Sequence, residues 1–164
     1  LMLKPSIERI PCKHIVVNGF DSPQTQETVE AAFSVGCALS SEKITLVEEI
    51  SEYRVAVSVN DDRSLRKATL RKEKIDREEK IRVTDIIKKI PLAKTKRLKW
   101  ETQSIFGSRG YSIGHYARVV RADLLIMNAQ EKPRFYHRFF PQDLEHILAE
   151  LPTDVLIIQS KKNG

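Results

Sequence analysis

The sequence has few cysteines and no long apolar run, and each shortage excludes a class of protein. No stretch of about 18 apolar residues occurs, so no helix is expected to span a bilayer. Cys12 and Cys37 are too few for a disulfide framework and favour reduced thiols in a cytoplasmic protein. Residues 1–5 lack the long apolar core of a secretory signal. The prediction is one domain over residues 1–164 with an ordinary apolar core.

Charge is distributed unevenly along the chain. The net charge is +6, but residues 63–99 hold 15 basic and 5 acidic residues, and the rest sums to −4. Segment 60–97 is therefore a basic insert, and its composition leaves open whether it is ordered. It predicts either a solvated surface or a contact for anionic partners. Trp100, just after the segment, is the one aromatic residue near it, so stacking on nucleic-acid bases is disfavoured. An anionic membrane surface is the partner that the resemblance described below favours. The candidate contacts are Arg66, Lys67, Arg71, Lys72, Lys88, Lys89, Lys94, Lys96 and Arg97.

Apolar residues follow two periods along the chain. Short apolar runs bounded by turn residues predict strands, and apolar residues three and four apart predict helices. Nearly all-apolar strands alternating with amphipathic helices are typical of a parallel sheet covered on both faces. We predict an α/β fold with a doubly wound open parallel sheet of about five strands. The expected strands are 14–20, 43–47, 53–59, 98–106, 122–127 and 154–158, and the expected helices are 23–40, 65–80, 84–90, 111–120 and 143–151.

Motifs that carry catalysis or bind metals are missing. The sequence has no Gly-x-Ser-x-Gly elbow, no P-loop lysine and no matched carboxylates at strand ends, so no enzymatic activity is expected. Cys12 and His14 have no second ligand pair at zinc spacing, and His137 and His146 straddle a predicted loop-to-helix junction. We therefore expect neither a metal nor a cofactor.

Polar residues gather where the first and the penultimate strands are predicted to end. Open α/β sheets bind ligands outside the carboxyl ends of their strands. Any small-molecule crevice would therefore involve Asn18, Asp21, Ser22, Asn128, Glu131, Arg134 and Gln142. The alternative for Asp21-Ser22-Pro23 is a simple helix start.

Two segments carry a resemblance to a known family. Ala122-Asp123-Leu124-Leu125-Ile126-Met127-Asn128, followed at the right distance by Leu151 to Ile158, resembles the late segment of the universal stress protein family. Residues 14–22 and 111–120 are similar to that family as well. The resemblance implies its adenine nucleotide alpha hydrolase-like fold.

The family's phosphate loop is where the sequence departs most. ATP-binding members carry Gly-x-x-Gly, nine residues, then Gly followed by Ser or Thr. Glycine lets backbone N–H groups approach phosphates closely. An ungapped match places Asn128, Glu131, Pro141 and Gln142 at these positions. The resemblance therefore implies a divergent member that has lost the ATP loop.

Retention of the fold without that loop is similar to domains at the cytosolic C-termini of membrane transporters. Cation–chloride cotransporters, amino-acid permeases and cation/proton antiporters carry such domains, and the start on Leu1 suits an excised fragment. The expected function is a non-catalytic regulatory and dimerisation domain. Two alternatives remain: a freestanding universal stress protein with weak or altered nucleotide binding, and an anion-surface or nucleic-acid-binding module.

The resemblance also implies a homodimer. The family's last strand lies at a sheet edge and often pairs across a two-fold axis. The candidate dimer strand is Val155, Leu156, Ile157 and Ile158. The aromatic loop 134–140 predicts either a plug in the former nucleotide volume or an exposed partner contact.

Overall fold

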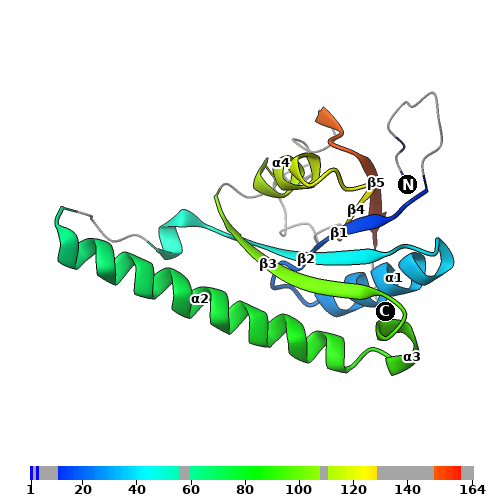
Figure 1. Cartoon of the computed structure of the whole chain (residues 1–164), viewed down its shortest axis with the longest axis horizontal. Helices are drawn as coiled ribbons and strands as arrows, with labels where there is room; N and C mark the ends of the chain where they lie inside the picture. Colours follow the sequence, from blue (N-terminus) through cyan, green and yellow to red (C-terminus); the bar gives the residue numbers. More distant parts are fainter. Residues whose placement is uncertain (2, 4–10, 56–59, 108–110, 129–149, 160–164) are drawn as a thin grey trace, which may run out of the picture.

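A computed structural model of the protein describes residues 1, 3, 11–55, 60–107, 111–128 and 150–159. Strands and helices alternate along the described chain (Figure 1). The elements are β1 (His14–Asn18), α1 (Thr25–Ala38), β2 (Lys43–Ile50), a 3₁₀ turn (Glu52–Arg54), α2 (Asp62–Lys88), α3 (Leu92–Thr95), β3 (Lys99–Phe106), α4 (Tyr111–Val119), β4 (Leu124–Asn128) and β5 (Asp154–Ile158).

Five strands in the described part of the chain form one parallel sheet in the order β3-β2-β1-β4-β5. All four neighbouring pairs are parallel. Parallel neighbours need a crossover connection. α1 supplies it between β1 and β2, and α2, within the basic segment 60–97, supplies it between β2 and β3. The predicted fold class is confirmed.

Helices cover both faces of the sheet (Figure 1). On one face, side chains of α1 and α2 pack on β1, β2 and β4; the buried cluster includes Ile15, Val17, Phe33, Ile44, Leu46, Val83, Ile87 and Ile126. On the other face, α4 covers a second cluster that includes Val16, Val47, Ile113, Ala117, Leu125, Met127 and Val155. Ile15, Val16 and Val17 of β1 alternate between the two clusters, which is why the middle of this strand is apolar at every position.

α2 is one continuous helix, so the predicted break between 65–80 and 84–90 is wrong. A capping box starts it: the Ser64 N–H donates to Asp61 Oδ1 at 2.7 Å, and the Asp61 N–H donates to Ser64 Oγ at 3.0 Å. No glycine or proline follows before Pro91, so nothing interrupts the backbone. No helix among the described residues is both long and apolar enough to cross a bilayer.

The strand predicted over 53–59 is wrong in its described part. Residues Glu52–Arg54 form a 3₁₀ turn, and Val55 is buried against Ile50 and Ile75. Because β2 continues to Ile50, the chain has to turn there to enter the α2 crossover, and alternation alone does not reveal this. Residues 56–59 and most of the helix predicted over 143–151 lie outside the described residues.

Candidate functional site

The carboxyl ends of β1 and β4 lie side by side at the centre of the sheet (Figure 1). After β1 the chain forms β2 and β3 on one side of it, and then returns to form β4 on the other side. The strand order therefore reverses between β1 and β4. Crevices at such switch points bind ligands in open α/β sheets. Asn18 ends β1 and Asn128 ends β4, and both residues are buried, with exposed fractions of 7% and 4%.

Neutral hydrogen bonds hold the described groups on the β4 side of the predicted crevice. Asn128 Nδ2 donates to Ser22 Oγ at 2.9 Å. The Ser22 N–H donates to Thr25 Oγ1 at 3.1 Å. Asn18 Oδ1 accepts from the Phe20 N–H at 2.9 Å. We call Asn18, Ser22 and Asn128 the neutral side of the crevice. Its buried polar groups are satisfied by the protein itself.

An ion-pair network lies on the other side of the predicted crevice, where β1 meets β2. Arg82 of α2 donates from Nη2 to the Gly19 carbonyl at 2.6 Å and to Glu48 Oε2 at 2.5 Å. Its Nε donates to Glu79 Oε2 at 2.8 Å, and Arg54 Nη1 donates to Glu79 Oε1 at 2.9 Å. Both glutamates are buried. We call Glu48, Glu79, Arg82 and Arg54 the charged side of the crevice.

The two buried glutamates respond to this network in opposite ways. Burial raises the pKa of Glu48 to about 8, against the opposing effect of Arg82. Burial also acts to raise the pKa of Glu79, but hydrogen bonds from Arg82 and Arg54 outweigh it, so that pKa is lowered. The network therefore keeps one carboxylate ionised and places a second carboxyl where it exchanges a proton near neutral pH.

The structure brings three of the predicted crevice residues together and leaves a fourth outside. Asn18, Ser22 and Asn128 form the neutral side, whereas the Asp21 side chain is 75% exposed, with Oδ1 3.9 Å from Arg82 Nη1. Neither Asp21 nor Ser22 is the N-cap of α1, which is Gln24. The remaining predicted crevice residues, Glu131, Arg134 and Gln142, and the aromatic loop 134–140 lie outside the described residues.

Comparison with known proteins identifies the fold. No protein-family model and no curated protein matches the sequence. Hypothetical protein MJ0577 has a similar structure, with a TM-score of 0.65 and 19% identity over 94% of this chain and 100% of that one. The universal stress protein UspA from Lactobacillus plantarum has a TM-score of 0.62 and 16% identity over 92% of this chain and 99% of its own. The fold is that of the universal stress proteins.

A universal stress protein in complex with cAMP has a TM-score of 0.57 and 16% identity, over 93% of this chain and 100% of its own. At these identities the likeness to universal stress proteins establishes the fold, and function has to be argued from the residues of the site. The fold implied by the sequence resemblance is thereby confirmed.

The charged side of the crevice was missed by sequence reasoning, although a signal for it exists. Glu48 lies in phase with the buried residues Ile44, Leu46 and Ile50 of β2. Glu79 lies four residues after Ile75 and four before Val83, in the buried row of α2. A carboxylate at an apolar position of both a strand and a helix predicts a buried partner of opposite charge.

The predicted basic contacts do not form one patch on this universal-stress fold. Arg66, Lys67, Arg71 and Lys72 lie on the amino half of α2, Lys88 and Lys89 at its carboxyl end, and Lys94, Lys96 and Arg97 in or after α3. The 27 residues of α2 separate its ends by about 40 Å. Lys72 Nζ lies 5.2 Å from the centroid of the Phe106 ring, and Lys94 Nζ donates to Ser34 Oγ at 2.9 Å.

The candidate dimer strand is an edge of the described sheet. β5 pairs with β4 along its whole length, from Asp154 to Ile158. Val155 is buried, whereas Leu156, Ile157 and Ile158 are half-buried. Among the described strands, none pairs with the outer edge of β5, so main-chain groups on that side face away from the sheet.

Proposed function

We propose that the chain is a non-catalytic regulatory and dimerisation domain, the cytosolic C-terminal part of a secondary membrane transporter. The observation that carries the non-catalytic part is that described polar groups at the carboxyl ends of β1 and β4 are hydrogen-bonded within the chain. Asn128 donates to Ser22 and Arg82 donates to the Gly19 carbonyl, so groups at the carboxyl end of β1 are engaged within the chain.

The phosphate-loop positions support the same conclusion. Asn128 stands where nucleotide-binding members place the first loop glycine, and its buried side-chain amide is committed to Ser22. Pro141, at a later glycine position, has no N–H to offer a phosphate. Glu131 adds a negative charge to the same loop sequence. These three positions therefore offer a triphosphate fewer favourable contacts than the glycine-rich loop does.

Dimerisation is proposed to use the outer edge of β5. An apolar edge strand is an aggregation hazard unless another chain or element pairs with it. Ile158→Lys places a charge on this edge, and we expect analytical ultracentrifugation to show a shift from dimer to monomer. Val119→Lys, at a residue of α4 that is 65% exposed, controls for the added charge alone. A wild-type protein that stays monomeric at all concentrations overturns this part of the proposal.

The transporter setting follows from the resemblance and from the basic segment 60–97. The parent reading frame tests it directly. We expect a region upstream that encodes about ten apolar segments of about 20 residues each. A complete reading frame without such segments removes the transporter setting but leaves the dimer and crevice proposals standing.

A second candidate is a freestanding universal stress protein with weak or altered nucleotide binding. The complex of a protein of the same fold with cAMP favours it. Thermal unfolding with ATP, AMP and cAMP separates the candidates, because a Kd of about 10 μM adds about 2.7 kcal/mol of stability at about 1 mM ligand. We expect an unchanged Tm and no hydrolysis of ATP. A saturable rise in Tm favours the second candidate instead.

A further inference from the structure

The outer face of α2 carries a regular stripe of side chains that none of the described elements covers. The buried face of the helix repeats at Ile75, Glu79, Val83 and Ile87. About half a turn away, exposed residues recur with the same helical period. We call this set the outer stripe: Arg63, Arg66, Leu70, Arg77, Ile81 and Lys88.

Most of the cations of the outer stripe are unneutralised. Arg63, Arg66 and Arg77 make no ion pair with any residue in the described ranges, whereas the Lys88 ammonium lies 2.8 Å from Asp85 Oδ1. Three guanidinium groups along one helix face create a positive potential that attracts anionic groups. Guanidinium also binds phosphate in a planar, bidentate manner.

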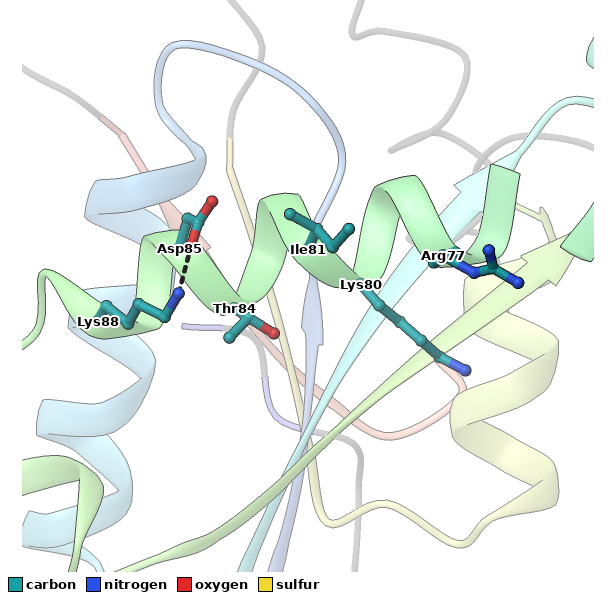
Figure 2. Close-up of a pocket in the computed structure, with 6 residues that line it drawn as sticks. All are labelled: Arg77, Lys80, Ile81, Thr84, Asp85 and Lys88. Carbon is teal, nitrogen blue, oxygen red and sulfur yellow. Dashed lines mark hydrogen bonds and ion pairs between the residues drawn. The ribbon is translucent and has the colours of Figure 1, made fainter. Parts of the chain in front are cut away.

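Two apolar side chains project from the same stripe. Leu70 is 64% exposed and Ile81 is 57% exposed, although neither contributes to the core. They lie eleven residues apart, about 16 Å along the helix. A shallow depression of 210 Å³ surrounds Ile81, lined by Arg77, Lys80, Thr84, Asp85 and Lys88 (Figure 2). Four cations and two exposed apolar side chains therefore lie along one line of the helix.

The position of α2 leaves this line accessible along its length. Lys72 lies over Phe106, the last residue of β3, so the ten residues before Lys72 extend past the end of that strand. Figure 1 shows α2 along one side of the sheet, running beyond β3. The stripe is thus a straight, outward-facing surface on a helix about 40 Å long.

We propose that the outer stripe binds an anionic lipid surface, with α2 parallel to the membrane. The arginines contact lipid phosphates, and Leu70 and Ile81 enter the boundary between headgroups and acyl chains. A nucleic-acid duplex satisfies the cations but leaves both apolar side chains, Leu70 and Ile81, facing phosphates. The proposal goes beyond the proposed function and does not depend on the transporter setting.

Vesicle co-sedimentation of the full chain tests this. With about 30% phosphatidylserine in phosphatidylcholine, we expect binding that pure phosphatidylcholine does not support. Arg66→Gln/Arg77→Gln removes two cations and should weaken binding about thirtyfold. Leu70→Gln/Ile81→Gln keeps the charge and should weaken it about tenfold. Glutamine has a helix propensity close to that of arginine and leucine, so α2 is retained.

The control is Lys13→Gln/Arg121→Asn, which removes the same charge from exposed positions outside α2. It should bind vesicles as the wild type does. Absence of binding to phosphatidylserine vesicles overturns the proposal. A second outcome also overturns it: Leu70→Gln/Ile81→Gln binds the vesicles as the wild type does, and duplex DNA binds the protein equally well at the same salt concentration. The contact is then a general polyanion site. Neither outcome changes the results expected from analytical ultracentrifugation of the dimer or from thermal unfolding with nucleotides.

Discussion

The neutral and charged sides of the crevice close the same end of β1 by different physics. On the neutral side, Asn128 donates to Ser22, and such a bond contributes about 0.5–1.5 kcal/mol net. On the charged side, Arg82, whose side chain is 23% exposed, joins the buried carboxyl groups of Glu48 and Glu79. A buried ion pair adds little net stability when intact but costs about 3–5 kcal/mol when one partner is removed.

The difference also concerns what each side connects. The neutral side links β4 to the loop that follows β1. The charged side links α2, the helix that carries the basic segment, to the Gly19 carbonyl at the end of β1. Arg82 contacts both α2 and the carboxyl end of β1. A substitution or a change of pH on the charged side is therefore expected to affect the stability of the helix and of the strand end together.

Removing the shared cation has the largest expected effect. Arg82→Ala leaves two buried carboxyl groups without their common partner, and we expect a loss of about 3–5 kcal/mol in urea-induced unfolding. Arg77→Ala is the matched control, because Arg77 is on the same helix but exposed, and its loss should stay within about 0.5 kcal/mol. Equal losses in the two variants contradict the role assigned to Arg82.

The pH dependence of the unfolding free energy also distinguishes the charged side from the neutral side. The folded-state pKa of Glu48 is about 8, above the ordinary value of 4.5. Between these values the folded protein binds a proton that the unfolded chain lacks, so this contribution to stability is full below about pH 4.5 and is lost as the pH rises through 8. In the wild type, Glu48 lowers the unfolding free energy as the pH rises from 5 to 8. Glu48→Gln should remove this decrease, as measured by urea unfolding at each pH.

Two controls accompany this pH series. Burial lowers the pKa of His14, which acts in the opposite direction, so the variant is compared with the wild type at each pH. Ser22→Ala, on the neutral side, should shift the whole curve without changing its slope. A slope that survives Glu48→Gln means that another group carries the pH dependence.

The same comparison explains which parts of the site the sequence could predict. Asn18, Ser22 and Asn128 directly follow or end apolar strands, and parallel topology brings the carboxyl ends of strands to one edge. Local pattern was therefore enough for them. Arg82 meets Glu48 across 34 residues, and only the path of α2 over the sheet brings them together. Arg82 is one of 15 basic residues in segment 63–99, and nothing in the local sequence distinguishes it from the others.

The fold was predictable for a related reason. Continuous apolar runs such as 15–17 and 155–158 have few alternatives to buried parallel strands. The predicted strand at 53–59 failed in its described part because alternation cannot distinguish a strand from a turn that buries one residue, here Val55. The predicted helix break failed because the continuity of α2 depends on the absence of Gly or Pro rather than on its apolar pattern.

Breaking the neutral side should cost less than breaking the charged side. Ser22→Ala removes the acceptor of the buried Asn128 amide, and an unsatisfied buried group costs about 1–3 kcal/mol. Urea unfolding checks the loss. Adding Asn128→Leu to Ser22→Ala removes the orphaned donor as well, so the double variant should recover part of the stability. A double variant less stable than Ser22→Ala argues that the Asn128 amide has another partner of equal importance.

The smallest expected effect is at Asp21, the predicted crevice residue that the structure places at the exposed margin of the charged side. Its Oδ1 lies 3.9 Å from Arg82 Nη1 and the side chain is 75% exposed, so water and salt screen the interaction. Asp21→Asn keeps the size and should change the unfolding free energy by less than about 0.5 kcal/mol. If Asp21→Asn instead loses nearly as much unfolding free energy as Arg82→Ala in the same urea series, Asp21 is a third carboxylate of the network. The charged side then includes Asp21.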